Sequence, residues 1–186
     1  IEETGSVCSS FFDATKEDYD IIYTSNATEA LNLAAENLDH HPDTEIEPVI
    51  LTTILEHSSN DLPWRAVKNL TLVRLMVNSS GLVDLTEMEA TLDRFNREHQ
   101  EGKQRVVLVS VTGASNVLGI FNDIEGIAHI AHEYGARILV DAAQMAAHKK
   151  IEMAKWGIDL LAFSSHKTYA PFGSGALIAR KGLLNF

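Results

Sequence analysis

The sequence predicts an α/β protein, a three-layer sandwich in which helices cover both faces of a mostly parallel, seven-stranded sheet. The first observation behind this prediction is that short apolar runs alternate with segments of helical period along the chain. The second is that most of these runs are apolar throughout, without polar residues at every second position. Strands of this kind are typical of parallel sheets that are buried between two layers of helices.

Seven segments are expected to form the strands, because each is rich in aliphatic and β-branched residues. In chain order they are residues 20–25, 48–53, 70–77, 105–111, 137–142, 158–164 and 175–180. The clearest helical patterns between them cover residues 27–38, 84–98 and 123–135. Asp84 and Glu87 have the spacing of a capping box, and Gly135 is expected to end the third of these helices.

Composition excludes several classes of protein. With 186 residues, 45% of them hydrophobic, the chain can enclose one sizeable core. Its formal charge of −11 disfavours binding to nucleic acid or to anionic membranes. Cys8 is the single cysteine, so a disulfide framework is excluded, and no apolar stretch has the length of a membrane span. The first ten residues lack the pattern of a secretory signal, which favours a cytoplasmic location.

Polar residues stand where several of the predicted strands end or shortly beyond. They are Asp141, Gln144, Ser164, His166, Lys167, His57 and the Asn-Ala-Thr turn at 26–28, which opens a predicted helix. Ligands of such sheets bind at the carboxyl ends of the strands. We therefore expect one ligand to contact all of these residues.

Pyridoxal 5'-phosphate (PLP) is a ligand that would use this set. Lys167 can form a Schiff base with its aldehyde, and Asp141 can keep its pyridine nitrogen protonated. The turn at 26–28 offers backbone N–H groups and a helix dipole to the phosphate. His57 can stack on the ring and take part in proton transfer on the substrate side. The loop after the strand at 158–164 is expected to present Lys167 to the aldehyde in a desolvated place.

The segments that carry these residues resemble those of the class V aminotransferases, a family of fold-type I PLP-dependent enzymes, and within them the cysteine desulfurase-like group. The resemblance extends from about Asp20 to Ala179. Its matching segments are SNATEALNL (25–33), EHSSNDLPW (56–64), SNVLG (115–119), VDAAQ (140–144) and SSHKTYAPFGSGAL (164–177).

The resemblance implies that four residues bind the phosphate group of PLP. Ala27 and Thr28 belong to the segment that resembles the phosphate turn of the family. Ser164 and His166 match the phosphate-binding serine and histidine that precede the Schiff-base lysine.

Five residues are implied to contact the cofactor ring or its aldehyde. His57 would stack on the ring, Asp141 would face the pyridine nitrogen, and Lys167 would form the Schiff base. Asn116 and Gln144 would lie near the ring hydroxyl. The expected catalytic residues are Lys167, His57 and Asp141.

The resemblance also implies a division of the chain. Residues 1–19 would form an N-terminal helical segment and residues 20–186 the PLP-binding large domain, whereas the C-terminal small domain of family members would be absent. That missing part would carry the arginine that grips the substrate carboxylate and, in desulfurases, the sulfur-accepting cysteine, a position that Cys8 does not match. Taken alone, this chain is therefore expected to be inactive.

The function implied is that of an enzyme acting on a small amino-acid substrate through an external aldimine, either cysteine desulfurase-like or a class V aminotransferase. The full-length protein is expected to be a homodimer. Desulfuration, lyase chemistry and transamination remain open alternatives.

Two other interpretations remain. Ser164 and Lys167 have the S-x-x-K spacing of serine acyl-transfer hydrolases, although Pro171 and Gly173 follow where that motif should open a helix. A noncatalytic relic of the PLP fold is the second. His129 and His132 lie one helical turn apart but have no further ligands in the sequence, so no metal site is predicted.

Overall fold

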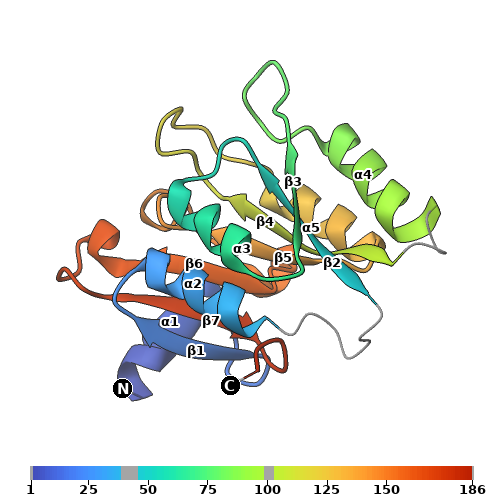
Figure 1. Ribbon diagram of the computed structural model, residues 1–186. Helices are drawn as coiled ribbons and strands as arrows, with labels where there is room; N and C mark the ends of the chain where they lie inside the picture. Colours follow the sequence, from blue (N-terminus) through green and yellow to red (C-terminus); the bar gives the residue numbers. More distant parts are fainter. Residues whose placement is uncertain (1, 39–45, 99–102, 186) are drawn as a thin grey trace.

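The computed structural model describes residues 2–38, 46–98 and 103–185, and it confirms the predicted α/β class. One seven-stranded sheet has the order β1-β7-β6-β5-β4-β2-β3 (Figure 1). Its strands are β1 (Tyr19–Thr24), β2 (Glu47–Thr53), β3 (Thr71–Leu75), β4 (Gln104–Thr112), β5 (Arg137–Asp141), β6 (Leu160–Ser164) and β7 (Gly175–Arg180). Neighbouring strands from β3 to β6 are parallel, whereas β7 is antiparallel to both β6 and β1.

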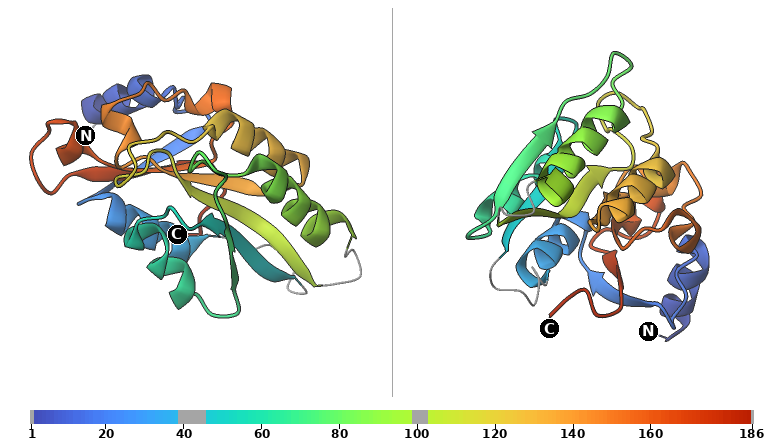
Figure 2. Two further views of the ribbon diagram at one scale, coloured as in Figure 1. Left: turned by 90° about the horizontal axis from the view of Figure 1, so that it is seen from above. Right: turned by 90° about the vertical axis from the view of Figure 1, so that its right-hand side faces the viewer.

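Helices cover both faces of the sheet, as predicted. They are α1 (Glu2–Phe12), α2 (Ala27–Asn37), α3 (Leu62–Ala66), α4 (Leu85–Asp93), α5 (Ile124–Glu133) and α6 (Met153–Trp156). Figure 2 shows α2 and α3 on one face and α1, α4, α5 and α6 on the other. Short helical turns complete the chain: η1 (Ser58–Asn60), η2 (Arg94–Glu98), η3 (Met145–Ala147) and η4 (Ser165–Thr168).

The predicted helix at 84–98 begins as expected but ends differently. The Asp84 side chain accepts hydrogen bonds from the backbone N–H groups of Thr86 and Glu87, so it caps α4. After Asp93 the chain widens into the π-helical turn η2. In that turn the Asn96 side chain exchanges hydrogen bonds with the backbone of Val106 on β4, and this contact draws the end of the helix toward the sheet.

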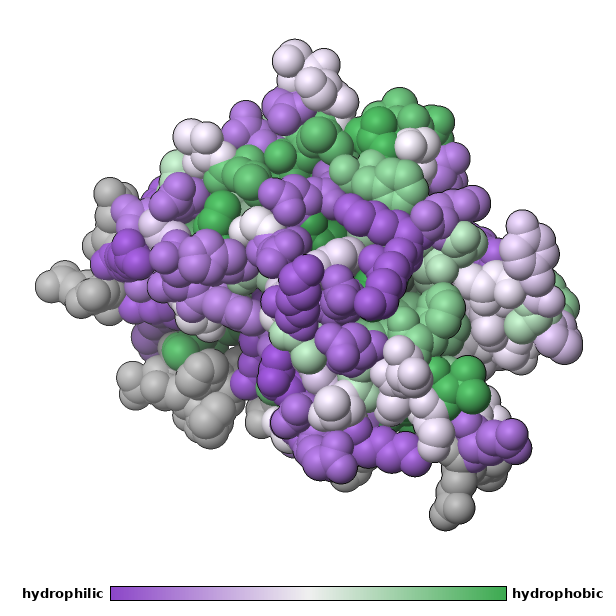
Figure 3. Space-filling model, turned by 180° about the vertical axis from the view of Figure 1, so that it is seen from behind, coloured by the Kyte–Doolittle hydropathy of each residue, from purple (hydrophilic) through white to green (hydrophobic). Residues whose placement is uncertain are grey.

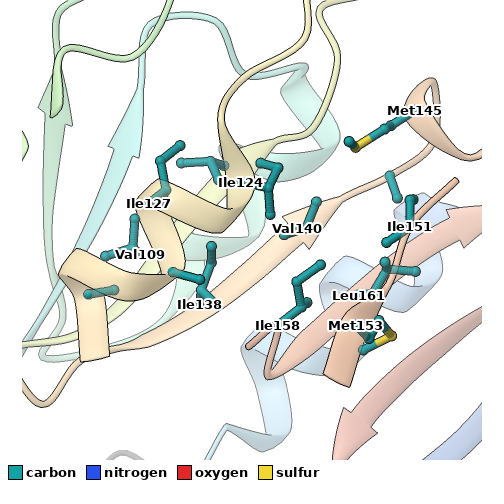
Figure 4. Close-up of a cluster of buried hydrophobic side chains, with 14 of the residues drawn as sticks. Val109, Ile124, Ile127, Ile138, Val140, Met145, Ile151, Met153, Ile158 and Leu161 are labelled. Atoms are coloured by element: carbon teal, nitrogen blue, oxygen red, sulfur yellow. The ribbon is translucent and has the colours of Figure 1, made fainter. Parts of the chain in front are cut away.

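The hydrophobic core lies in two layers, one on each face of the sheet. Figure 4 shows the layer beneath α5, where Ile124 and Ile127 point toward Val109, Ile138 and Val140 of the sheet. All five side chains are buried. Burial of each such side chain stabilises the fold by roughly 1.5–3 kcal/mol, which fixes α5 against β4 and β5.

The second layer lies between the sheet and α2 with α3. Ala30 and Ala34 face the sheet, and their small side chains let α2 approach Leu139 closely. Trp64 of α3 is fully buried in the same layer. The start of α2 is thereby held over the carboxyl ends of the central strands.

The outer surface of the layer of α1, α4 and α5 is mainly hydrophilic across its middle, with hydrophobic patches toward the top (Figure 3). Among residues 2–38, 46–98 and 103–185, no helix is both long enough and apolar enough to cross a membrane.

Candidate functional site

A pocket of about 280 Å³ lies at the carboxyl edge of the sheet. All nine residues predicted to bind PLP line it: Ala27, Thr28, His57, Asn116, Asp141, Gln144, Ser164, His166 and Lys167. They come from separate parts of the chain, and the parallel strands bring them together because their carboxyl ends meet at one edge. A second pocket of about 280 Å³, near Arg105 and Arg137 at the amino ends of β4 and β5, contains none of them and has no carboxylate in its lining.

The first turn of α2 forms one wall of the pocket. Asn26 caps the helix, since its side-chain oxygen accepts a hydrogen bond of 2.9 Å from the backbone N–H of Glu29. The backbone N–H of Ala27 donates to the Ser164 hydroxyl oxygen at 2.7 Å. Within the described part of the chain, neither the N–H nor the hydroxyl of Thr28 has a hydrogen-bond partner. Free donors at a helix N-terminus favour an anionic group at this wall.

The end of β6 and the turn η4 form the opposite wall. Ser164 is buried, and because its oxygen accepts from Ala27, its own proton is free to donate toward the pocket. The Nδ1 atom of His166 is buried and has no partner among the described residues. The His166 ring packs against that of Phe172, with 5.0 Å between the centroids. An unpaired ring nitrogen and a free hydroxyl proton therefore lie on this wall, opposite the donors of α2.

Gly175, the first residue of β7, allows this narrow spacing. A Cβ atom at this position would lie 2.6 Å from the backbone oxygen of Phe163 and 2.8 Å from Cα of Asn26. Both are backbone atoms, so any side chain at residue 175 would push the N-terminal turn of α2 away from β6.

Asp141 lies at the buried end of the pocket, with its side chain enclosed by the sheet. One carboxylate oxygen, Oδ1, accepts a 3.0 Å hydrogen bond from the backbone N–H of Ala143. Burial raises the pKa of the Asp141 carboxyl, while the Ala143 hydrogen bond and the charges of Lys167 and His57 lower it. No cation within the described residues pairs directly with Asp141. A cationic ligand group beside this carboxylate would supply the missing partner.

His57 begins the turn η1 and is exposed at the mouth of the pocket. Its Nδ1 atom lies 2.6 Å from the Ser59 hydroxyl and accepts a hydrogen bond of 3.2 Å from the Ser59 backbone N–H. Because a backbone N–H can only donate, the neutral His57 ring carries its proton on Nε2.

Lys167 is exposed, which contradicts the expectation of a desolvated place for this lysine. The physical reason is that η4 lies at the surface. Its neighbours Tyr169 and Phe172 are 99% and 90% exposed. The walls of the pocket in the described part of the chain leave the Lys167 ammonium in contact with solvent.

The interpretation as a serine hydrolase finds little support in this geometry. The Ser164 oxygen accepts a hydrogen bond from Ala27, and no hydrogen bond joins Ser164 to Lys167 in the part of the chain that the structure describes. A nucleophilic serine needs a base within hydrogen-bond reach. The paired histidines of α5 also have other neighbours, since His132 Nε2 lies 2.8 Å from Asp159 Oδ2.

Several residues of the pocket were not predicted from the sequence. They are Ser59, Thr112, Ala114, Ala143 and Phe172. Thr112 ends β4 and could have been found by the rule that identified Asp141 at the end of β5. The others belong to loops whose path depends on tertiary packing, so no comparable signal is present in the sequence.

The model of the family "Aminotransferase class-V" matches residues 1–186 of this chain. A probable cysteine desulfurase of Borreliella burgdorferi is 36% identical over 180 residues, which are 95% of this chain and 40% of that protein. A cysteine desulfurase of Dickeya dadantii is 33% identical, over 99% of this chain and 42% of its own length. The chain thus spans less than half the length of these relatives.

Solved structures agree with this relationship. The cysteine desulfurase CsdA from Escherichia coli superposes with a TM-score of 0.85 and 26% identity, covering 98% of this chain and 43% of that one. The apo structure of a cysteine desulfurase from Thermococcus onnurineus gives a TM-score of 0.82 and 34% identity, covering 97% and 42% of the two chains. The sequence and the fold are therefore shared with one family, and the chain belongs to the class V aminotransferases.

Proposed function

We propose that the chain is the cofactor-binding part of a PLP-dependent, cysteine desulfurase-like enzyme whose substrate is the amino acid cysteine. The observation that carries the proposal is that Lys167 and the buried carboxylate of Asp141 line one pocket with the N-terminal turn of α2. An amine for the aldehyde, an anion for the ring nitrogen and donors for the phosphate are the three groups that PLP requires.

The unused polar atoms of the pocket support this choice of cofactor. Among the described residues, His166 Nδ1 is buried without a partner, the buried Ser164 hydroxyl has its proton available, and the exposed Thr28 has an unpaired N–H and hydroxyl. Buried polar groups normally find hydrogen-bond partners, so the unpaired His166 nitrogen beside the Ser164 and Thr28 donors favours a bound polar group. A phosphate group supplies several acceptor oxygens at once.

The residues of this chain would have separate roles in binding the cofactor and in transferring protons. Thr28, Ser164 and His166 would bind the phosphate, and Asp141 would hold a proton on the ring nitrogen. Lys167 Nζ would attach the cofactor covalently and, as a free amine, could accept the proton from the substrate α-carbon. PLP, when bound, supplies an electron sink for the electrons left on that carbon.

His57 would occupy the substrate side of the pocket. Its Nε2–H can donate to a substrate or cofactor oxygen, because Nδ1 is engaged by Ser59. The ring face of His57 can also pack on the cofactor. Asn116, which is exposed, and Gln144, which is half-buried, would provide further polar contacts to the ring hydroxyl.

Residues 20–186 are proposed to form the PLP-binding large domain, with 1–19 as a preceding helical segment, in a cytoplasmic homodimer. Large apolar side chains beside the pocket support the homodimer. Val117, Leu118, Tyr169 and Phe172 are 54% to 99% exposed, and such surface is often covered by a partner. Light scattering of the full-length protein should give the mass of a dimer, and a strict monomer at high concentration would contradict it.

The cofactor assignment is tested by covalent labelling. The full-length protein is incubated with PLP, reduced with borohydride and digested, and the peptides are mapped. The adduct should lie on Lys167 and should be absent from a Lys167→Ala variant. Labelling that falls mainly on Lys149 or Lys150 would refute the assignment. Separate assays of sulfide release from cysteine and of oxo-acid formation then distinguish desulfuration from transamination.

A further inference from the structure

Glu56 directly precedes His57, and its side chain is bonded on both sides of that histidine. One carboxyl oxygen lies 2.6 Å from the hydroxyl of Thr53, the last residue of β2. The other accepts a 2.6 Å hydrogen bond from the side-chain amide of Asn60. Glu56 therefore links the last residue of β2 to the last residue of η1, with His57 in between.

Asn60 extends this connection into the core. It is fully buried, and its side-chain oxygen accepts from the Ser110 hydroxyl at 2.7 Å and from the Trp64 indole N–H at 3.2 Å. Ser110 belongs to β4 and Trp64 to α3, and both side chains are fully buried. The polar network from Thr53 through Glu56 and Asn60 thus ties the turn to two strands and a helix.

The His57 ring has few direct contacts of its own. Within the described part of the chain, its Nδ1 atom bonds only to Ser59, which lies in the same turn, and the side chain is exposed. The backbone of the turn is held by a bond of 2.8 Å from the Asn60 N–H to the His57 carbonyl and by one of 3.1 Å from the Leu55 N–H to the Thr53 hydroxyl. The place of the ring is consequently set by the turn, and the turn is set by Glu56 and Asn60.

We propose that Glu56 and Asn60 are positioning residues that fix His57 over the pocket. The inference rests on the proposed function, since it assigns these two residues to the histidine of that site. Neither side chain lines the pocket. They act through the turn, by holding the His57 ring where it meets the cofactor and substrate.

The test compares two variants of Glu56 in the full-length protein. Glu56→Gln keeps the shape of the side chain and can still accept from Asn60 while donating to Thr53. Glu56→Ala removes both connections, together with the hydrogen bond from the Thr112 backbone. Asp159→Ala is the matched control, because Asp159, like the half-buried Glu56, is a carboxylate bonded to several partners, but it lies away from the pocket.

The first measurement uses the cofactor-free protein with isotope-labelled histidine, so it does not depend on activity. The His57 ring signals, assigned with a His57→Gln variant, should shift or split in Glu56→Ala and should be restored in Glu56→Gln. Asp159→Ala should leave them unchanged. A His57 spectrum identical in wild type and Glu56→Ala would overturn the proposal.

The second measurement is turnover per bound cofactor. A displacement of about 1 Å in an active-site group can cost roughly 100-fold in rate, so Glu56→Ala should lose between about tenfold and 100-fold. Glu56→Gln should recover most of that loss. If Glu56→Ala fails to fold, Thr53→Val removes one of the two connections and should give a smaller change of the His57 signals in the same direction; no change would refute the proposal.

The two measurements separate this inference from the proposed function. Disturbed His57 signals in a protein that shows no PLP-dependent turnover would leave the positioning role standing and reject the enzyme assignment. Normal turnover in Glu56→Ala, in a wild-type background that is active with PLP, would reject the positioning role and leave the function intact.

Discussion

Replacing Glu56 with glutamine should make the stability of the protein less dependent on pH. Burial raises the pKa of the Glu56 carboxyl from its ordinary value of 4.5 to about 7, and the nearby charge of Asp141 adds to the increase. Hydrogen bonds from the side chains of Thr53 and Asn60 and from the backbone of Thr112 lower the pKa but do not offset burial. The folded protein therefore holds a proton on Glu56 that the unfolded chain releases between these two pH values.

The sign of the effect follows from proton linkage. Between pH 4.5 and about 7 the folded state binds more protons than the unfolded state at Glu56, so the free energy of unfolding falls as pH rises. The difference between a pKa of about 7 in the folded protein and 4.5 in the unfolded chain corresponds to about 3 kcal/mol, at about 1.36 kcal/mol for each pH unit. This stabilisation is fully present below pH 4.5 and is lost once pH passes about 7.

Glutamine has no proton to lose, so Glu56→Gln should avoid this loss. The free energy of unfolding is measured with urea on the cofactor-free, full-length protein. The value for the variant minus the value for wild type should increase by about 2 kcal/mol between about pH 5.5 and about pH 8. Glu36→Gln, which changes an exposed carboxylate on α2, is the control and should show no such trend. A difference between Glu56→Gln and wild type that stays constant over this range would show that Glu56 ionises normally in the folded protein.

Three further changes test the site and the core. Asp141→Asn should leave PLP bound but reduce turnover by more than about tenfold, since the ring nitrogen loses the anion that keeps it protonated; unchanged turnover would place Asp141 away from the ring. Ser164→Ala should weaken PLP binding by about tenfold, because one charge-assisted hydrogen bond to the phosphate is lost. Binding of pyridoxal, which lacks the phosphate, should change little, and an equal loss for both ligands in a binding titration would contradict the assigned role. Ile127→Ala should lower the free energy of unfolding by about 2–5 kcal/mol, since this side chain is fully buried beneath α5; denaturant unfolding that shows a loss below about 1 kcal/mol would contradict the packing.

The strands could be predicted from the sequence because their signal is local. Each is a run of apolar residues, and burial on both faces requires such a run whatever the neighbouring strands are. Confirmation is least complete at the sheet edge, where the predicted strand 70–77 is observed only as Thr71–Leu75. The end of α4 was likewise missed, because it depends on hydrogen bonds between Asn96 and Val106 of β4. A local sequence pattern does not show which distant segment a side chain contacts.

The candidate site could be predicted as a set because parallel strands end at one edge. That rule predicts that His57, Asp141 and Ser164 lie close together, and in the structure all three line one pocket. It could not reveal the exposure of Lys167, which depends on how far η4 extends from the sheet. It also missed Phe172, whose ring reaches His166 only through the fold of the loop between them.

Glu56 shows most clearly what a sequence leaves out. At this position a glutamate beside a histidine suggests an exposed, charged turn, yet its carboxyl is enclosed by Thr53 and Asn60. The charge of Asp141 is one cause of its raised pKa, so the two carboxyl groups are coupled. Because the interaction is reciprocal, ionisation of Asp141 favours the protonated form of Glu56, and a cationic group placed beside Asp141 would offset this effect and make Glu56 easier to ionise.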